Sequence, residues 1–437
     1  MGDRGAVTFD DLRPELLANP ATFAQPLHVQ AIYRQLRRRA PLAHVEPKGY
    51  RPFWLLTRHA DIMNVERQPE VYAASPRTVL LPDKVEAIYE KKYGDRNGVK
   101  PLTHMDGEYH RDHRAVTRDW FGLKNLKHHE RQIAAIAKEF VDRMQDFGGK
   151  CDFTADIAYW FPLRVVMTLM GVPRGDEAEV LRMTQRLFSP ADRDLKQPRP
   201  IQAPPTQVSP SQPPPSSPGA RDVIAEFASY YHRLGDERRK TPRNDIISTI
   251  ANGQVNGCPM AYHEMTSYYI IVSTAGHDTT AASIGGGLDA LLDFPDQLSK
   301  LQGDLDLLSR AAEEFVRWVA PVKHFMRTPN QDVVLHDTVV PAGEAIMLSY
   351  PSACRDEMVY EDPDRLRIDR PPTPYHLAFG YGPHFCLGRY LATMEIRALF
   401  RELLPRIKWI ERAGTATHIE SVFVSGLKSL PVSCQFK

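Results

Sequence analysis

The 437-residue sequence predicts a mainly α-helical fold with small β-sheets. Apolar residues recur at three- and four-residue spacing over residues 109–146 and 153–187, which is the period of a helix with one buried face. An apolar stretch over residues 268–293 and a last helical stretch ending at Leu404 extend this pattern. Strand-like runs are short and lie toward both ends of the chain. We therefore expect helices to form the body of the protein and small sheets to accompany them.

The shorter elements follow from local composition. Residues 53–57, Phe-Trp-Leu-Leu-Thr, predict a strand, and a helix follows that Asp61 can begin. A helix is expected at 307–318, and short strands are expected at 333–335 and 345–348. No internal repeat interrupts this order.

A proline-rich segment at 197–219 separates two helical regions. Pro, Ser and Gln dominate it, so it cannot form a helix or a central strand. A partner-binding proline motif is the alternative to a plain surface loop. We favour the loop, because helical patterning resumes at Ala220, and we expect a single domain over residues 1–437.

Composition excludes several classes of protein. Hydrophobic residues make up 42% and charged residues 25%, as in a soluble globular protein, and the net charge of +1 favours neither nucleic acid nor an anionic membrane. Residues 1–20 lack the apolar core of a secretory signal, and no apolar run reaches the ~20 residues of a membrane span. Five scattered cysteines without a C-x-x-C pair argue against a disulfide scaffold. We expect a cytoplasmic protein.

The strongest chemical signal is the ten-residue stretch 379–388. Its three glycines and one proline predict a tightly bent backbone. Cys386 stands just before a helix that begins at Arg389, where amide N–H groups favour a thiolate over a thiol. A thiolate on iron donates electron density that favours O–O cleavage.

This stretch resembles the signature F-x-x-G-x-x-x-C-x-G of the cytochrome P-450 superfamily, through Phe379, Gly382, Cys386 and Gly388. The resemblance extends over roughly residues 30–431 and is strongest to the soluble bacterial branch that hydroxylates α-terpineol. It implies the fold of that superfamily, a helical haem-binding bundle with a minor β-rich region. It also implies haem b, with Cys386 as the axial ligand of the iron.

A second resemblance is to the sequence A-G-x-D-T-T, found here at 275–280. It implies that Thr279 hydrogen-bonds the bound oxygen, that Asp278 relays protons and that Gly276 leaves room for O₂. Proton delivery inside an apolar cavity needs a hydroxyl and a carboxylate of this kind. The alternative is that the threonines only bond to their own helix.

Two more patterns complete the resemblance. Glu314 and Arg317 share a helix face and, with Arg370, imply a structural clamp. The remaining resemblance concerns side chains that can donate hydrogen bonds to the haem carboxylates, and these are His110, Arg114, Arg327 and His384.

By family position, the substrate pocket is expected to be lined by Thr274, Ala275, Val322, Lys323, His324, Phe325, Phe423 and Val424. Such a pocket suits a terpenoid or a small aromatic hydrocarbon. Lys323 or His324 can either hold a substrate oxygen or point away from the pocket.

The expected activity is hydroxylation with O₂. Because no flavin or iron–sulfur motif is present, electrons are expected from a [2Fe-2S] ferredoxin and its reductase. An acidic ferredoxin would meet a basic face that carries Arg114, Arg118, Lys124, Lys127 and Arg389.

Three other activities stay open beside this one. They are tailoring of a larger or carrier-bound natural product, haem sensing without turnover, and a peroxide-driven reaction. Asp278 and Thr279 argue against the last two. Cys354, and Asp106-Gly107-Glu108 in place of Asp-Pro-Pro, depart from the usual pattern and weaken the transfer of an exact substrate.

Overall fold

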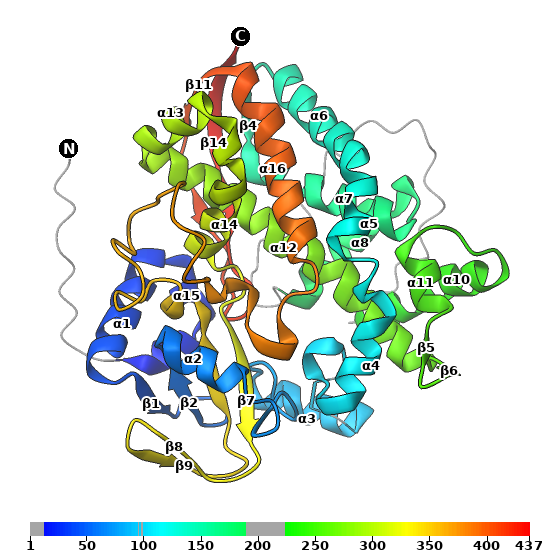
Figure 1. The fold of residues 1–437 in the computed structure, drawn as a ribbon, viewed down its shortest axis with the longest axis vertical. Helices are drawn as coiled ribbons and strands as arrows, with labels where there is room; N and C mark the ends of the chain where they lie inside the picture. The colour runs from blue at the N-terminus through cyan, green and yellow to red at the C-terminus, as the bar shows by residue number, and fades with distance from the viewer. Residues whose placement is uncertain (1–12, 95, 98, 189–222) are drawn as a thin grey trace.

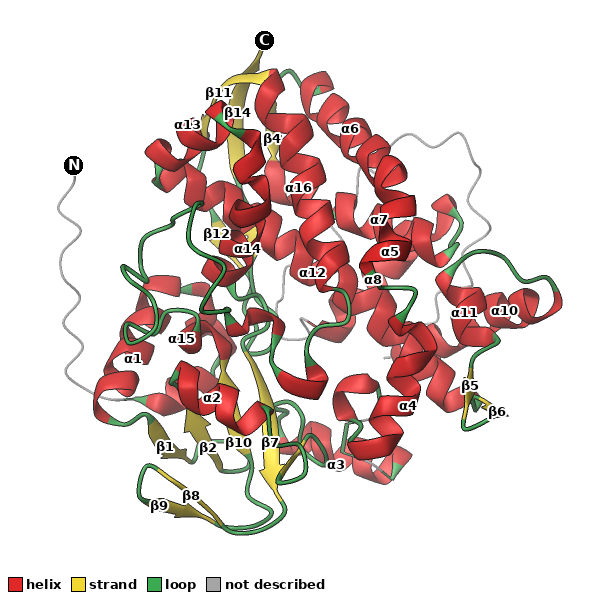
Figure 2. Cartoon of the chain, in the orientation of Figure 1, coloured by secondary structure: helices red, strands yellow, loops and turns green. Residues whose placement is uncertain are grey.

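The computed structural model describes residues 13–94, 96–97, 99–188 and 223–437. Over these residues helices predominate and the sheets are small, which confirms the predicted fold class (Figure 2). The proline-rich segment 197–219 lies outside the described residues, so its surface location and the single domain stay predictions.

The helices follow the predicted order. Their bounds are α1 Pro26–Arg39, α2 His59–Glu66, α3 Asp83–Tyr93, α4 Gly107–Arg118, α5 Leu123–Leu126, α6 Glu130–Asp146, α7 Trp160–Met170, α8 Glu177–Phe188, α10 Val223–Lys240, α11 Ile246–Ala251, α12 Tyr262–Asp293, α13 Pro295–Gly303, α14 Leu308–Val319, α15 Tyr350–Ala353 and α16 Arg389–Arg406. The long helix α12 starts earlier than predicted, because Glu264 accepts a hydrogen bond from the amide of Ala261 at 2.8 Å and caps the helix there.

The strands form one five-stranded sheet, in the order β1-β2-β10-β7-β3, and several smaller ones. Their bounds are β1 Leu42–Val45, β2 Phe53–Leu56, β3 Tyr72–Ala73, β4 Lys150–Asp152, β5 Gln254–Val255, β6 Cys258–Pro259, β7 His324–Pro329, β8 Val333–Leu335, β9 Thr338–Val340, β10 Ile346–Ser349, β11 Ile407–Arg412, β12 Thr417–His418, β13 Leu427–Ser429 and β14 Pro431–Phe436. Leu55 of β2 lies opposite Met347 of β10 in a parallel pair, so the sheet joins segments that are far apart in sequence.

Helix α12 runs through the centre of the helical region, beside α16 and α14 (Figure 1). Glycine permits its close approach to α14, because a Cβ atom on Gly287 would lie 2.6 Å from the ring of Phe315. The ring of Phe315 in turn packs against that of Phe400 on α16, with 5.2 Å between centroids. The three helices therefore share one apolar core.

Among the described residues, no helix combines the length and the apolar character that crossing a membrane requires.

Candidate active site

The loop that carries Cys386 is tightly bent by two short 3₁₀ turns. Gly380 and Gly382 have φ angles of 70° and 66°, a region that favours glycine. The amide of Cys386 donates to the carbonyl oxygen of Phe379 at 2.9 Å and closes the loop. Helix α16 begins three residues later, at Arg389. The loop therefore presents Cys386 at the N-terminus of a long helix.

Donor groups surround the sulfur of Cys386. Burial raises the pKa of its thiol, whereas the backbone amides of Gly388 and Arg389 and the guanidinium of Arg114 oppose this by favouring the thiolate. Burial is the larger effect in the protein chain. A metal ion deprotonates a coordinating thiol outright, and the same amides would then stabilise the bound thiolate.

One face of α12 stays partly accessible in the middle of the molecule. The partly exposed residues Ile271, Val272, Ala275, Gly276 and Thr279 recur at three- and four-residue spacing, so they lie on one side of the helix. We call this face the accessible strip. A strip of this kind is suited to contact a bound ligand.

The glycine of the strip, Gly276, has a packing reason of its own. A Cβ atom added there would lie 3.0 Å from a methyl group of Val166 on α7. The space left by its missing side chain therefore faces α7, and room for O₂ at this position stays a prediction.

The hydroxyl of Thr279 donates to the carbonyl oxygen of Ala275 at 2.8 Å, and that of Thr280 donates to Gly276 at 3.0 Å. This is the local bond that the sequence left open as the alternative. It uses the hydroxyl proton of Thr279 but leaves the oxygen able to accept a hydrogen bond.

The neighbouring Asp278 is paired with His277, which the sequence reasoning did not single out. Its carboxylate lies 2.9 Å from Nε2 of His277, while Nδ1 of His277 lies 3.1 Å from the carbonyl oxygen of Ser273. The first contact is an ion pair rather than a well-aligned hydrogen bond. Burial, the largest single effect, lowers the pKa of His277, but Asp278 and the carbonyl oxygen of Ser273 together raise it overall.

Four nitrogen-bearing side chains gather beside the Cys386 loop. We call them the donor cluster, and they are His110 and Arg114 on α4, Arg327 on β7 and His384 in the loop itself. The rings of His110 and His384 lie 4.2 Å apart between centroids, and Arg114 donates to the carbonyl oxygen of Phe385 at 2.5 Å. Arg114 is therefore turned toward the loop and is only partly exposed, so its place in the basic face stays a prediction.

The donor cluster has more donors than acceptors. Nε2 of His110 is buried and has no hydrogen-bond partner among the described residues. Burial, followed by the charge of nearby cations, lowers the pKa of His110 to about 4 and that of His384 to about 2. A carboxylate is the group that this arrangement would bind best.

The structure adds one acid to the cluster, Glu66 at the end of α2. Tyr350 donates to its Oε1 at 2.7 Å, and Nη2 of Arg327 lies 3.5 Å from the same atom. Burial raises the pKa of Glu66 to about 7, although Arg327 and Tyr350 act to lower it. No local pattern marks Glu66, because its partners lie more than 250 residues away and only the five-stranded sheet brings them close.

The predicted clamp residues also meet. Glu314 accepts from Arg317 at 2.7 and 2.8 Å, and from Nε of Arg370 at 3.1 and 3.3 Å. Arg317 also donates to the carbonyl oxygen of Cys354 at 2.7 Å. The carboxylate of Glu314 is thus shared by two guanidinium groups, which ties α14 to the segment around Arg370.

Residues predicted to line the substrate pocket form one wall. Val322 and Val424 form a β-bridge, and the amide of Lys323 donates to the carbonyl oxygen of Phe423 at 2.8 Å. The rings of Phe325 and Phe423 lie 5.6 Å apart in a T-shaped arrangement. We call this the 322–325/423–424 wall.

The two polar members of the wall are already engaged. The ammonium of Lys323 donates to the carbonyl oxygens of Val319 and Ala320 at 3.2 and 2.9 Å, where it caps the end of α14. His324 is buried, with Nε2 accepting from the amide of Leu80 at 3.0 Å and Nδ1 lying 3.0 Å from the carbonyl oxygen of Val422. Of the alternatives that the sequence left open, both side chains therefore serve the protein's own backbone.

The remaining pocket candidates lie on α12. Thr274 is buried, and its hydroxyl donates to the carbonyl oxygen of Ile270 at 2.6 Å. Ala275 belongs to the accessible strip.

Comparison with known proteins decides the family. The family model described as Cytochrome P-450 matches residues 83–428, which is most of the chain. The chain belongs to the cytochrome P-450 family. It is 36% identical over 415 residues to cytochrome P-450-terp of a Pseudomonas species, covering 94% of this chain and 95% of that protein.

Solved structures of this family superpose closely. The crystal structure of CYP108D1 from Novosphingobium aromaticivorans gives a TM-score of 0.86 at 34% identity and covers 98% of this chain and 100% of that one. CYP268A2 of Mycobacterium marinum, solved in complex with pseudoionone, gives 0.83 at 28% identity and covers 98% and 100%. The protein is thus a cytochrome P-450 monooxygenase, an enzyme with a haem-thiolate iron cofactor that uses O₂ and a redox partner.

The residues of this P-450 fit such a cofactor. Cys386 supplies sulfur backed by amides, and the donor cluster contains a buried, unpartnered Nε2 on His110. A Cβ atom added to Gly388 would meet nothing within 4 Å, so space lies beside the loop. A planar iron compound with carboxylate side chains matches all three features.

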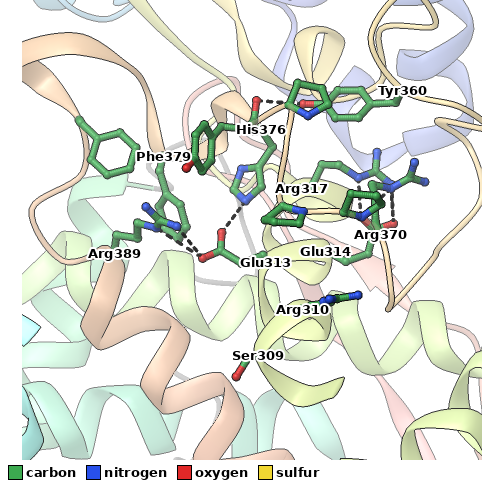
Figure 3. A pocket seen from close by; sticks show the side chains of 15 residues that line it. Ser309, Arg310, Glu313, Glu314, Arg317, Tyr360, Arg370, His376, Phe379 and Arg389 are labelled. Carbon is green, nitrogen blue, oxygen red and sulfur yellow. Dashed lines mark hydrogen bonds and ion pairs between the residues drawn. The ribbon is translucent and has the colours of Figure 1, made fainter. Parts of the chain in front are cut away.

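Beyond the Cys386 loop, this P-450 has a cleft of about 250 Å³ whose lining includes Phe379 and Phe385. Figure 3 shows the clamp on one side of it, and on the other Glu313 between His376 and Arg389. Glu313 lies 3.0 Å from Nε2 of His376 and 3.1 Å from Nη2 of Arg389. Arg389 is therefore paired with a carboxylate, and so is Arg118, whose Nε lies 3.4 Å from Asp119. Among the described residues, Lys124 and Lys127 are left as the exposed, unpaired cations of the predicted basic face.

Proposed function

We propose that this chain is a ferredoxin-dependent monooxygenase that uses haem b and O₂ to hydroxylate a small apolar molecule, a terpenoid or an aromatic hydrocarbon. The observation that carries the substrate class is the 322–325/423–424 wall. Its polar side chains, Lys323 and His324, are bound to backbone groups, so Val322, Phe325 and Phe423 are left to form an apolar surface. The similarity to cytochrome P-450-terp along nearly the whole chain supports the terpenoid side of this class.

In this proposal Cys386 is the ligand of the haem iron, and the donor cluster holds the haem carboxylates. Phe379, Gly276 and Gly388 contact or flank the haem. When bound, the haem supplies the thiolate-ligated iron at which O₂ is activated for insertion into a C–H bond.

Asp278 and Thr279 deliver protons in this proposal. The accessible strip is mostly apolar, so protons need a polar route to the reacting oxygen. The carboxylate of Asp278, which lies 2.9 Å from Nε2 of His277, takes up and releases protons at its Oδ atoms. The oxygen of Thr279, whose own proton is held by Ala275, accepts the hydrogen bond that orients the incoming donor.

The redox partner meets the face beside the Cys386 loop. Lys124 and Lys127 on and after α5 are exposed, and Arg118 at the end of α4 is exposed beside Asp119. The cleft lined by Phe379 and Phe385 gives this face an apolar centre. Exposed cations and an apolar cleft near the same loop suit an acidic [2Fe-2S] ferredoxin.

The first test is the absorption spectrum of the purified protein, reduced under carbon monoxide and followed by titration with terpenes, small aromatic hydrocarbons and bulkier scaffolds. A strongly red-shifted Soret band and a low- to high-spin shift with the small apolar compounds would support the proposal. An ordinary haem–CO band would contradict Cys386 as the ligand. A spin shift with bulky or carrier-bound compounds alone would select natural-product tailoring instead.

Product analysis completes the test. With ferredoxin, its reductase and O₂, the compound that shifts the spin state is expected to yield a hydroxylated product. Binding without turnover would indicate a sensor, and turnover with peroxide alone would indicate a peroxide-driven enzyme.

A further inference from the structure

Glu66 occupies an unusual place among the buried acids of this protein. It lies between the Cys386 loop and Arg327. A Cβ atom on Gly382 would approach the carbonyl oxygen of Glu66 to 2.3 Å, and one on Gly380 would lie 3.5 Å from its Oε1. The backbone amide of Tyr381 also hydrogen-bonds to the Glu66 carboxylate. The acid is therefore in direct contact with the loop that presents Cys386.

Each element packed around Glu66 offers it a donor or a positive charge. Strand β7 contributes Arg327, and α15 contributes Tyr350. Behind Arg327 lie His384, whose pKa Arg327 lowers, and His110, on which Arg327 also acts. Among the described residues, Glu66 is the only carboxylate paired with Arg327. It is thus positioned to compete with any other anion for that guanidinium.

The two oxygens of Glu66 differ. Oε1 faces Tyr350 and Arg327, whereas Oε2 is buried and has no hydrogen-bond partner among the described residues. A proton on this carboxyl group would therefore sit on Oε2, because Oε1 already accepts. In that form the group is neutral and Oε2 becomes a donor.

We propose that Glu66 is a proton-binding site that controls how tightly the carboxylate of the cofactor is held at Arg327. This inference rests on the proposed role of Arg327 in binding haem. Ionised Glu66 competes for Arg327 and repels the cofactor carboxylate. Glu66 that has taken a proton from solvent releases Arg327 and no longer repels the cofactor carboxylate.

The sign of the pH dependence follows from the charges. In the protein chain, burial raises the pKa of Glu66 to about 7. A second carboxylate at Arg327 would raise this pKa further, because a nearby negative charge favours the neutral acid. Cofactor binding is therefore coupled to uptake of a proton near neutral pH. The cofactor is held more tightly below this pKa and less tightly above it.

The test is transfer of haem from the loaded protein to excess apomyoglobin, followed by absorbance between about pH 6 and about pH 9. For the wild type we expect the transfer rate to rise by about tenfold or more across this range, since one unit of pKa shift corresponds to a factor of ten. E66Q is expected to transfer haem slowly at every pH, because glutamine cannot ionise. E70Q is the matched control. It removes the same charge from an exposed position four residues later, and we expect it to follow the wild type.

A rate for E66Q that rises with pH as the wild type does would overturn the proposal, as would faster transfer from E66Q at low pH. If E66Q does not take up haem, the pH profile of haem transfer from Y350F tests the proposal instead. Loss of the Tyr350 hydrogen bond raises the pKa of Glu66, so the rise in rate must move to higher pH; an unmoved profile overturns the proposal. The assay needs no substrate, so failure to find a hydroxylated product leaves this result intact.

Discussion

Two buried groups of charged side chains lie near the Cys386 loop, and they differ in how completely their charges are matched. In the clamp, the carboxylate of Glu314 binds both Arg317 and Arg370. In the donor cluster, two arginines and two histidines share a single acid, Glu66, and His110 keeps a buried nitrogen without a partner among the described residues. Buried arginines thus have different roles in the two groups. A saturated group holds the fold, whereas an unsaturated group is suited to bind an anion from outside the chain.

The largest expected effect comes from breaking the saturated group. Glu314→Ala leaves two buried guanidinium groups without their carboxylate, and we expect a loss of about 3–5 kcal/mol in the free energy of unfolding. Chemical denaturation of the cofactor-free protein measures it. Glu313→Ala is the matched control on the same helix, because the side chain of Glu313 is 32% exposed and its ion pairs are worth less. Equal losses in the two variants would contradict the assignment of the clamp.

The next largest effect concerns the accessible strip, which has no ion pair and where the hydroxyl of Thr279 bonds to the backbone of its own helix. Thr279→Ala removes a hydroxyl that is bonded within α12, so folding and haem content should be unchanged. We expect hydroxylated product per reducing equivalent to fall about tenfold or more, with the missing equivalents appearing as peroxide. Thr280→Ala, which removes the neighbouring bond, is the control and should stay coupled. Unchanged coupling in Thr279→Ala would remove this residue from proton delivery.

A smaller effect is expected on the pH dependence of stability, and it concerns the unsaturated donor cluster. Burial lowers the pKa of His110 and of His324 from 6.5 to about 4. As the pH falls below 6.5, these histidines become protonated in the unfolded chain but stay neutral in the folded chain. The cofactor-free protein should therefore lose stability between about pH 6.5 and about pH 4. Haem carboxylates beside His110 should make this loss smaller in the loaded protein.

Thermal unfolding of both forms across this pH range measures the difference. His110→Phe should reduce the loss of stability of the cofactor-free protein, leaving the part due to His324, and should narrow the difference between the two forms. Parallel profiles for the loaded and cofactor-free wild type would mean that no anion binds near His110.

The smallest expected effect lies on the exposed face, where no charge is buried. Lys124→Glu should weaken ferredoxin binding a few-fold, corresponding to about 1 kcal/mol or less, and added salt should diminish the difference. Reduction rates at several ferredoxin concentrations and ionic strengths measure it. Lys408→Glu, on exposed β11, is the control. Equal effects of the two substitutions would place the partner elsewhere.

The sequence predicts best what repeats or lies close along the chain. The existence and the end of α12 follow from a long apolar stretch, and the contact between Glu314 and Arg317 follows from their spacing on one helix. Contacts built by the five-stranded sheet could not be found in this way. Glu66 meets Arg327 and Tyr350 only because β2, β10 and β7 are neighbours.

Side-chain direction is the other limit of the sequence. Lys323 and His324 stand among wall residues, and their types suggest contact with a polar substrate atom. In the structure, backbone carbonyl and amide groups at Val319, Ala320, Leu80 and Val422 take their polar atoms. Which backbone groups need a partner depends on the folded path of three separate segments, and composition does not reveal it.

The apolar and the polar residues of the wall have different roles, and this difference matters for engineering. Positions 322, 325 and 423 shape the apolar surface, whereas Lys323 and His324 hold its frame to α14, to the chain at Leu80 and to the turn before Phe423. A library that diversifies the first three positions would test the proposed substrate pocket on an intact scaffold. Randomising all five positions together is expected to yield many unstable variants, because Lys323 and His324 bond to backbone groups of neighbouring segments. Neighbouring positions of this wall therefore differ in how well they tolerate substitution.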